Sequence, residues 1–186
     1  TGLLENLPQG IENQDNTVQI IDIDYFRDIA DNLGHKFGDK VLKSVANYLS
    51  DKYGGQAMVA RLHSDVFALL FLGSNIEPSE INTNISKSIL VDGNSLRLGV
   101  TLGIANYSPD DEVKFDIETL LRHAEIAMKV AKENNRGKSQ LFDPAYESES
   151  KARLILLNDL RAAFIHQELF LQLQPKVDIN DSSVVG

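Results

Sequence analysis

The stretch AMVARLHSDVFALLFL, from Ala57 to Leu72, decides the fold. It consists of two apolar runs on either side of a short polar tip, His63-Ser64-Asp65. Runs of this length that are rich in Val, Leu and Phe predict the two strands of a buried β-hairpin, and we expect both strands to be central in their sheet. Only the tip offers side chains for chemistry. A second predicted strand, over 18–23, also ends in side chains suited to chemistry, because Asp22 and Asp24 lie at its carboxyl end and share one face.

Hydrophobic periodicity and turn signals place the other elements around these strands. Apolar positions at helical spacing predict four helices, over 25–33, 37–52, 78–90 and 117–136. Two further strands are expected over 95–107 and 139–142, and a short helix over 3–7. Strands that pair as hairpins with helices between them predict an α+β fold, in which helices cover an antiparallel sheet. Asp116 is the expected N-cap of the helix that follows it.

The end of the chain forms a separate group of predictions. We expect a polar junction over 144–150 and then a helix over 151–166. The apolar side chains of that helix are expected on one side: Leu154, Leu157, Leu160, Ala163 and Phe164. The stretch 169–177 is strand-like, although Pro175 weakens its end. We expect the chain to be a piece of a longer protein, since it begins at Thr1 without Met.

Composition excludes several classes of function. The 186 residues are 42% hydrophobic, contain no cysteine and carry a net charge of -9. The excess of acid argues against a nucleic-acid partner, because phosphate binding needs clustered Lys and Arg. The lack of cysteine excludes disulfides and thiolate zinc sites. The longest apolar run, VFALLFL, is far too short to span a membrane. We expect a cytoplasmic location, and attachment of the full-length protein to the inner membrane through an upstream region stays open.

Asp22, Asp24 and Asp65 are the candidate metal ligands. Carboxylates at the ends of neighbouring strands suit Mg²⁺ bound with a nucleotide, since Mg²⁺ takes one or two carboxylates and completes its shell with water and phosphate. The alternative is structural: Asp24 caps the following helix and Asp65 is a turn residue. His63 is either a ligand or proton shuttle, or simply a solvated turn residue.

Lys132 and Arg136 are the candidate phosphate ligands. They lie four residues apart, on one face near the end of a predicted helix. Two cations in this arrangement could clamp phosphates. They could equally serve the helix alone, because basic residues in a last turn stabilise the helix dipole.

Several ordered motifs resemble those of a known family. The runs IDIDYFRDIADNLGHKFGDKVL, ARLHSDVFALLF, GVTLGIA and LLRHAEIAMKVAKENNRGK resemble, in order and spacing, the GGDEF domain of diguanylate cyclases. The last run, NDLRAAFIHQELFLQLQPKVDINDSSVVG, is similar to the first helix and strand of an EAL domain, the cyclic di-GMP phosphodiesterase family. The resemblance implies a ferredoxin-like, cyclase-type α+β domain with an antiparallel-rich central sheet over 1–145. A linker helix and the truncated start of an EAL domain would then fill 146–186.

The resemblance also implies a reaction and a set of ligands. The family joins two GTP molecules, one held by each subunit of a dimer, into cyclic di-GMP with two Mg²⁺. The residues at the family's binding positions are, for metal, Asp22, the Ile23 carbonyl and Asp65, and, for nucleotide, Arg27, Asp39, Lys132 and Arg136.

This chain departs from the family pattern at the residues that carry the chemistry. The signature Gly-Gly-Asp/Glu-Glu-Phe is here His63-Ser64-Asp65-Val66-Phe67. Val66 replaces the Glu and can neither bind metal nor accept a proton. Ala30 stands where an Asn contacts the guanine base, and the family's product-binding site is replaced by residues 54–57. Loss of these residues with retention of the fold residues is typical of a degenerate, regulatory GGDEF domain.

Three functions follow as hypotheses. The first is a catalytically inactive GGDEF module that binds GTP and Mg²⁺ weakly and regulates an attached EAL domain. The second is a weak cyclase that uses Asp22 and Asp65, against which Val66 argues. The third is a module for dimerisation or protein interaction that binds no nucleotide. The retained binding residues argue against the third: Asp22, Asp39, Lys132 and Arg136.

Overall fold

The computed structural model describes residues 7–73, 78–87, 89–111, 114–172, 174–180 and 183–184. The chain divides into two compact units, Thr1–Tyr146 and Glu147–Gly186, which are described separately. Most of the helix expected over 3–7 lies outside the described residues.

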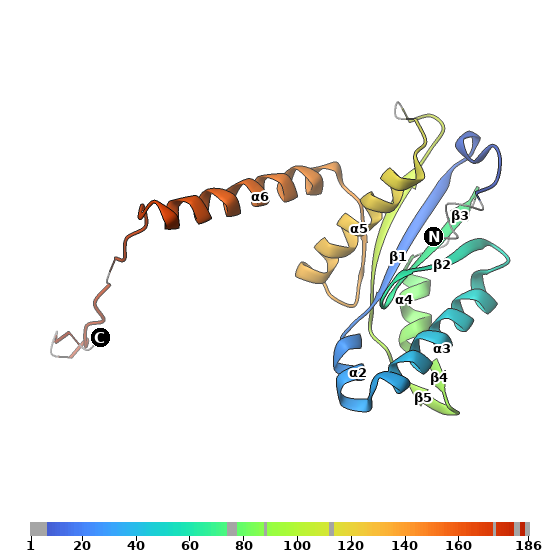
Figure 1. Cartoon of the computed structure of the whole chain (residues 1–186), viewed down its shortest axis with the longest axis horizontal. Coiled ribbons are helices and arrows are strands. Elements are labelled where there is room, and N and C mark those ends of the chain that lie inside the picture. Colours follow the sequence, from blue (N-terminus) through green and yellow to red (C-terminus); the bar gives the residue numbers. More distant parts are fainter. Residues whose placement is uncertain are drawn as a thin grey trace. The chain divides into compact units, whose positions relative to one another are not determined.

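A five-stranded sheet in the order β2-β3-β1-β6-β7 forms the centre of the first unit (Figure 1). Neighbouring strands are antiparallel except for β6 and β7, which are parallel. This mixed, antiparallel-rich sheet confirms the predicted α+β fold. The strands are β1 (Asn16–Ile23), β2 (Ala57–His63), β3 (Val66–Leu72), β6 (Val100–Tyr107) and β7 (Ser139–Leu141).

Helices cover both faces of the sheet (Figure 1). One face packs on α3 (His35–Tyr53) and α4 (Pro78–Lys87), and the other packs on α5 (Ile117–Asn134). Because successive side chains of a strand point to opposite faces, β1 sends Ile21 and Ile23 towards α3 and Val18 and Ile20 towards α5. All eight residues of β1 are buried. The remaining elements of this unit are short: η1 (Ile11–Asn13), α2 (Phe26–Leu33), β4 (Ile89–Val91) and β5 (Asn94–Leu96).

The deciding hairpin differs from its prediction in two respects. β2 is an edge strand, not a central one, and it is less buried than β3, in which every residue from Val66 to Phe71 is buried. His63 belongs to β2 and pairs with Val66, so the turn has only two residues. Ser64 takes a positive φ of 43° there, and the guanidinium of Arg61 donates to its carbonyl from Nε (2.8 Å) and Nη2 (2.5 Å).

The region between 78 and 107 is also more divided than predicted. α4 ends at Lys87, and the residues after it form the small β4–β5 hairpin, so the helix expected to reach residue 90 and the single strand over 95–107 are both wrong. The physical reason is the turn Asp92-Gly93, whose φ values are 52° and 77°. An Asp-Gly pair accepts this left-handed backbone and favours a two-residue hairpin. β6 then begins at Val100.

The last helix, α6, covers Pro144–Ile165, so the junction expected over 144–150 is helical. Asp143 explains the early start, because its Oδ1 accepts a hydrogen bond from the N–H of Ala145 (2.8 Å) and Pro144 suits the first turn. Among the described residues of the stretch 169–177, the expected strand is represented by an isolated bridge between Val177 and Val184. Within the described residues, no helix has the length and apolar character needed to cross a membrane.

Candidate functional site

Two buried carboxylates mark the carboxyl end of β1. Asp22 and Asp24 are only 5% and 6% exposed. Asp22 lies opposite Val66 of β3 on one side and opposite Thr101 of β6 on the other. The central position of β1 thus places two acids at the end of the sheet, between strands that bury them. Buried carboxylates require a compensating cation or hydrogen-bond donor.

The end of α5 and the loop after it supply two cations: α5 ends at Asn134, so Arg136, which was predicted within the helix, lies in that loop. Nζ of Lys132 lies 2.5 Å from Oδ2 of Asp22, and Nη1 of Arg136 lies 3.7 Å from Oδ1 of Asp24. The Arg136 guanidinium also lies over the ring of Tyr25, 5.0 Å from its centroid. This is a cation–π contact. The predicted pair of basic residues therefore meets the predicted pair of acids.

The loop that carries Arg136 is held by a polar network that the sequence analysis missed. Oγ1 of Thr101 donates to Oδ1 of Asp24 (2.7 Å) and accepts from the N–H of Gly137 (3.0 Å). Nδ2 of Asn82 donates to the carbonyls of Gly137 (2.8 Å) and Val100 (2.9 Å). The signal that could have revealed Thr101 is its polar side chain within the apolar run GVTLGIA.

Electrostatics make Asp22 the most unusual acid of the group. Burial raises its pKa above the ordinary value of 3.8, the neighbouring Asp65 and Asp24 act in the same direction, and Lys132 opposes them. Oδ1 of Asp22 is buried and has no hydrogen-bond partner among the described residues. An unpaired carboxylate oxygen fits a hard cation such as Mg²⁺. The described residues contain no cluster of three or more His, Asp or Glu side chains suited to a metal.

The hairpin tip meets the end of β1 through the backbone. The N–H of Ile23 donates to the carbonyl of Asp65 at 3.3 Å, so the main chains of two expected metal ligands lie side by side. His63 is exposed. Val66 is 3% exposed and belongs to the apolar cluster under α5, together with Ile20 and Met128. Val66 is therefore part of the hydrophobic core.

The other positions that the family resemblance assigns to the nucleotide lie on α2 and α3: Arg27 for a phosphate, and Asp39 and Ala30 for the base. Arg27 and Asp39 are exposed, and within the described residues they are not part of the ion-paired cluster. Ala30 is 8% exposed, and a Cβ placed on Gly38 would lie 3.3 Å from the side chains of both Ala30 and Phe26. Position 30 therefore serves close packing between α2 and α3.

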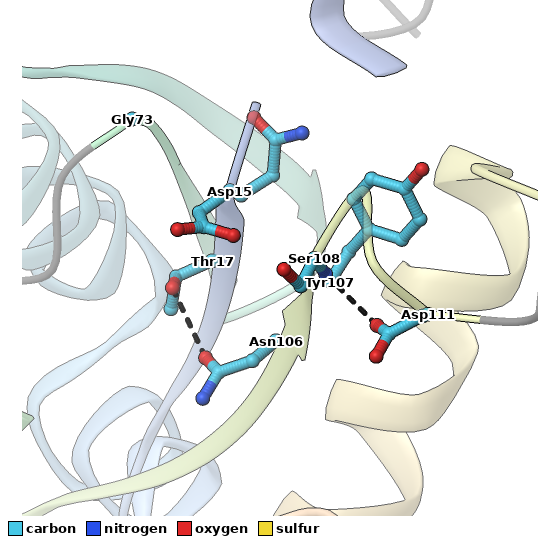
Figure 2. Close-up of a pocket in the computed structure, with 8 residues that line it drawn as sticks. Asp15, Thr17, Gly73, Asn106, Tyr107, Ser108 and Asp111 are labelled. Atoms are coloured by element: carbon cyan, nitrogen blue, oxygen red, sulfur yellow. Dashed lines mark hydrogen bonds between the residues drawn. The ribbon is translucent and has the colours of Figure 1, made fainter. Parts of the chain in front are cut away.

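A cavity of about 580 Å³ lies at the opposite end of β1 (Figure 2). Thr17 donates to Asn106 there (3.0 Å), and the N–H of Ser108 donates to Asp111 (2.8 Å). The charged side chains in its lining, Asp15 and Asp111, are both acidic. A phosphate would be repelled there, so the cluster around Asp22 is the better candidate for an anionic ligand.

Comparison with known proteins agrees with this geometry. Residues 2–138 match the family model described as "Diguanylate cyclase, GGDEF domain". The bifunctional diguanylate cyclase/cyclic di-GMP phosphodiesterase MucR of Pseudomonas aeruginosa is 30% identical over 91% of this chain, and the cyclic di-GMP phosphodiesterase PdeR of Escherichia coli is 30% identical over 94%. The chain spans only 25% and 27% of the lengths of these two proteins.

A solved structure supports the same assignment. The GGDEF domain of TpbB from Pseudomonas aeruginosa superposes with a TM-score of 0.65 at 30% identity, over 74% of this chain and 83% of that one. The family model lies within the first unit described above, and the relatives and the solved structure indicate the same family. The chain therefore belongs to the GGDEF family of diguanylate cyclase domains.

Proposed function

We propose that this chain is a regulatory, catalytically inactive GGDEF domain of a cyclic di-GMP signalling protein. In this proposal it binds guanine nucleotide and Mg²⁺ weakly and modulates an EAL domain that follows it. The observation that carries the proposal is the position of Val66, which lies opposite Asp22 and is packed into the core beneath α5. A side chain so placed supplies neither a metal ligand nor a base, and general-base and electrostatic terms each contribute about a hundredfold or more to such reactions.

Retained cations and acids support residual nucleotide binding. Asp22, Asp65 and the Ile23 carbonyl would hold Mg²⁺, which supplies charge neutralisation of the phosphates when it is bound. Lys132 and Arg136 would meet the triphosphate. The missing base contact at Ala30 and the altered tip each cost roughly 1–3 kcal/mol, which together weaken binding by about one to four orders of magnitude relative to an intact family member.

The proposal of a following EAL domain is supported by the extent of the alignments. MucR and PdeR, whose names include cyclic di-GMP phosphodiesterase, align over 91% and 94% of the chain. The diguanylate cyclase TpbB aligns over only 72%. This longer coverage supports the proposal that the second unit begins a phosphodiesterase domain.

Two measurements on the chain test this function. Incubation with GTP and either Mg²⁺ or Mn²⁺, followed by chromatography, should give no detectable cyclic di-GMP, with an intact cyclase of the family as the positive control. Product formed within about tenfold of the rate of that control would contradict inactivity. Calorimetry with GTP and Mg²⁺ should show weak binding that disappears when Mg²⁺ is removed. If GTP gave no binding heat either with or without Mg²⁺, the result would favour a module for dimerisation or protein interaction that binds no nucleotide.

A further inference from the structure

Both cations expected to hold phosphates are already paired with carboxylates of the same site. Lys132 lies on Asp22 at 2.5 Å, and Arg136 lies near Asp24 at 3.7 Å. The first pair is the more enclosed, since the side chains of Lys132 and Asp22 are 29% and 6% exposed. The ammonium of Lys132 is therefore an internal cation that already neutralises Asp22, the carboxylate that Mg²⁺ would bind.

This pairing disfavours each ligand when it binds alone. A metal-free triphosphate that attracts Lys132 would leave Asp22 buried with both oxygens unpaired, because Oδ1 already lacks a partner among the described residues. Breaking a buried ion pair in this way leaves an uncompensated charge, which is strongly unfavourable. Mg²⁺ without a phosphate would displace Lys132 from Asp22, so the ammonium would lose its ion-pair partner beside a second cation.

The two ligands together avoid both penalties. When Mg²⁺ takes Asp22 while a phosphate takes Lys132, one ion pair is exchanged for two and no buried charge is left alone. We propose that the Asp22–Lys132 pair makes this site specific for the metal–polyphosphate chelate, and excludes free polyphosphate and free metal. The inference rests on the proposed nucleotide function, and it identifies Lys132 as the residue that couples the two ligands.

The decisive test measures inorganic tripolyphosphate binding by calorimetry, with and without Mg²⁺. The wild-type chain should bind the metal-free ion at least about a hundredfold more weakly than its Mg²⁺ chelate. Asp22→Asn keeps the size of the side chain but releases Lys132, so its affinity for metal-free tripolyphosphate should rise about tenfold or more. Added Mg²⁺ should then no longer strengthen binding.

A matched control distinguishes the effect of breaking the Asp22–Lys132 pair from the effect of removing one negative charge from the chain. Asp92→Asn removes the same charge from another Lys–Asp pair, Lys40 with Asp92 at 2.5 Å, which lies on the surface with both side chains about half exposed. It should leave both affinities unchanged. Metal-free binding that fails to rise in Asp22→Asn, or that rises equally in Asp92→Asn, overturns the proposal.

A reciprocal variant covers the possibility that Asp22→Asn folds poorly. Lys132→Gln removes the internal cation, so Mn²⁺ measured alone by electron paramagnetic resonance should bind at least about tenfold more tightly than to the wild-type chain. Unchanged Mn²⁺ affinity would contradict the proposal. The tripolyphosphate and Mn²⁺ titrations use no guanine nucleotide, so their results do not depend on GTP binding. A failure to bind GTP would contradict the proposed function but not this inference.

Discussion

At the scale of single residues, Val66 belongs to the hydrophobic core although it lies at the end of β3 that faces Asp22. Its side chain packs with Ile20 and Met128, on the face of the sheet that also carries Asp22. Val66→Glu would therefore bury a charge beside another carboxylate. In metal-free buffer the free energy of unfolding should fall by about 3 kcal/mol, because an uncompensated buried charge is strongly destabilising.

Two comparisons complete the Val66 test by urea unfolding. Val66→Gln has the same shape without the charge and should be clearly less destabilised. Mg²⁺ should restore part of the stability of Val66→Glu and leave Val66→Gln unaffected. If the two variants were equally unstable and both ignored Mg²⁺, packing alone would account for the effect.

Asp116 is a second residue whose role is local and testable. Its carboxylate accepts hydrogen bonds from the N–H groups of Glu118 (3.3 Å) and Thr119 (3.1 Å). Oγ1 of Thr119 also donates to this carboxylate (2.5 Å). This hydroxyl bond, followed by the N–H bonds, lowers the pKa of Asp116 below the ordinary 3.8. A lowered folded-state pKa stabilises the fold above pH 3.8, and this contribution is lost as the pH falls through the folded-state value.

Thermal melts over a range of pH should therefore separate two variants of this cap. Asp116→Ala should melt below the wild type at pH 7, and the difference should narrow as the pH falls below 3.8. Asp116→Asn keeps the cap and should stay close to the wild type at pH 7. A constant difference for Asp116→Ala at every pH would exclude the ionised cap as the cause.

At the scale of elements, the packing of α5 on β6 depends on Gly103. A Cβ at this position would lie 2.0 Å from the carbonyl oxygen of Ala124 and 2.3 Å from the backbone nitrogen of Met128. Gly103→Ala should lower the free energy of unfolding by about 3 kcal/mol, since the helix must move away from the strand. Gly55→Ala, where no atom lies within 4 Å, is the matched control and should change stability by less than about 0.5 kcal/mol. Equal urea midpoints for the two variants would show that α5 tolerates the shift.

The elements that could be predicted from sequence are those with strong local signals. β1 and α5 have a clear apolar pattern, and α5 also has its Asp116 cap, so both lie close to their predicted positions. The β4–β5 hairpin and the early start of α6 depend on one short turn each, Asp92-Gly93 and Asp143-Pro144, which a search for longer periodic segments passes over.

The candidate site was predictable as a set of residue types but not as a set of partners. Asp22 and Lys132 could each be named from a strand end and a helix end. Their contact depends on α5 packing across β6 and β1, which joins residues far apart in the chain. The role of Thr101 is similar, because a buried hydroxyl becomes significant only when Asp24 and the loop at Gly137 are placed beside it.

At the scale of the whole molecule, α6 presents more apolar surface than one side of a helix. Beside the apolar side chains expected on one side, such as Leu154, the neighbouring Ile155 and Leu156 are also 61% and 67% exposed. Exposed apolar side chains that lie close together on one helix usually mark a surface that packs against a partner. The chain on its own should therefore self-associate, with an apparent mass by light scattering that rises with concentration.

A variant of α6 tests that expectation. Leu160 and Phe164 line an apolar hollow of the second unit, and the double change Leu160→Glu with Phe164→Glu should keep the chain at the monomer mass. Ala152→Glu, at an exposed position of the same helix, should still self-associate. A wild-type chain that stays monomeric, with α6 protected from hydrogen exchange, would show that this helix packs within a single copy.

The central place of β1 has a consequence for the chain as it leaves the ribosome. β1 pairs with β3 on one side and with β6 on the other, and β6 is made later. Roughly 30 residues separate the two partners, which at about 5–20 residues per second corresponds to on the order of 2 to 6 seconds of synthesis. During that interval the edge of β1 that will pair with β6 has no partner. An open strand edge is a template for pairing with another chain. Nascent copies on neighbouring ribosomes are therefore most vulnerable to misassembly just before β6 is translated.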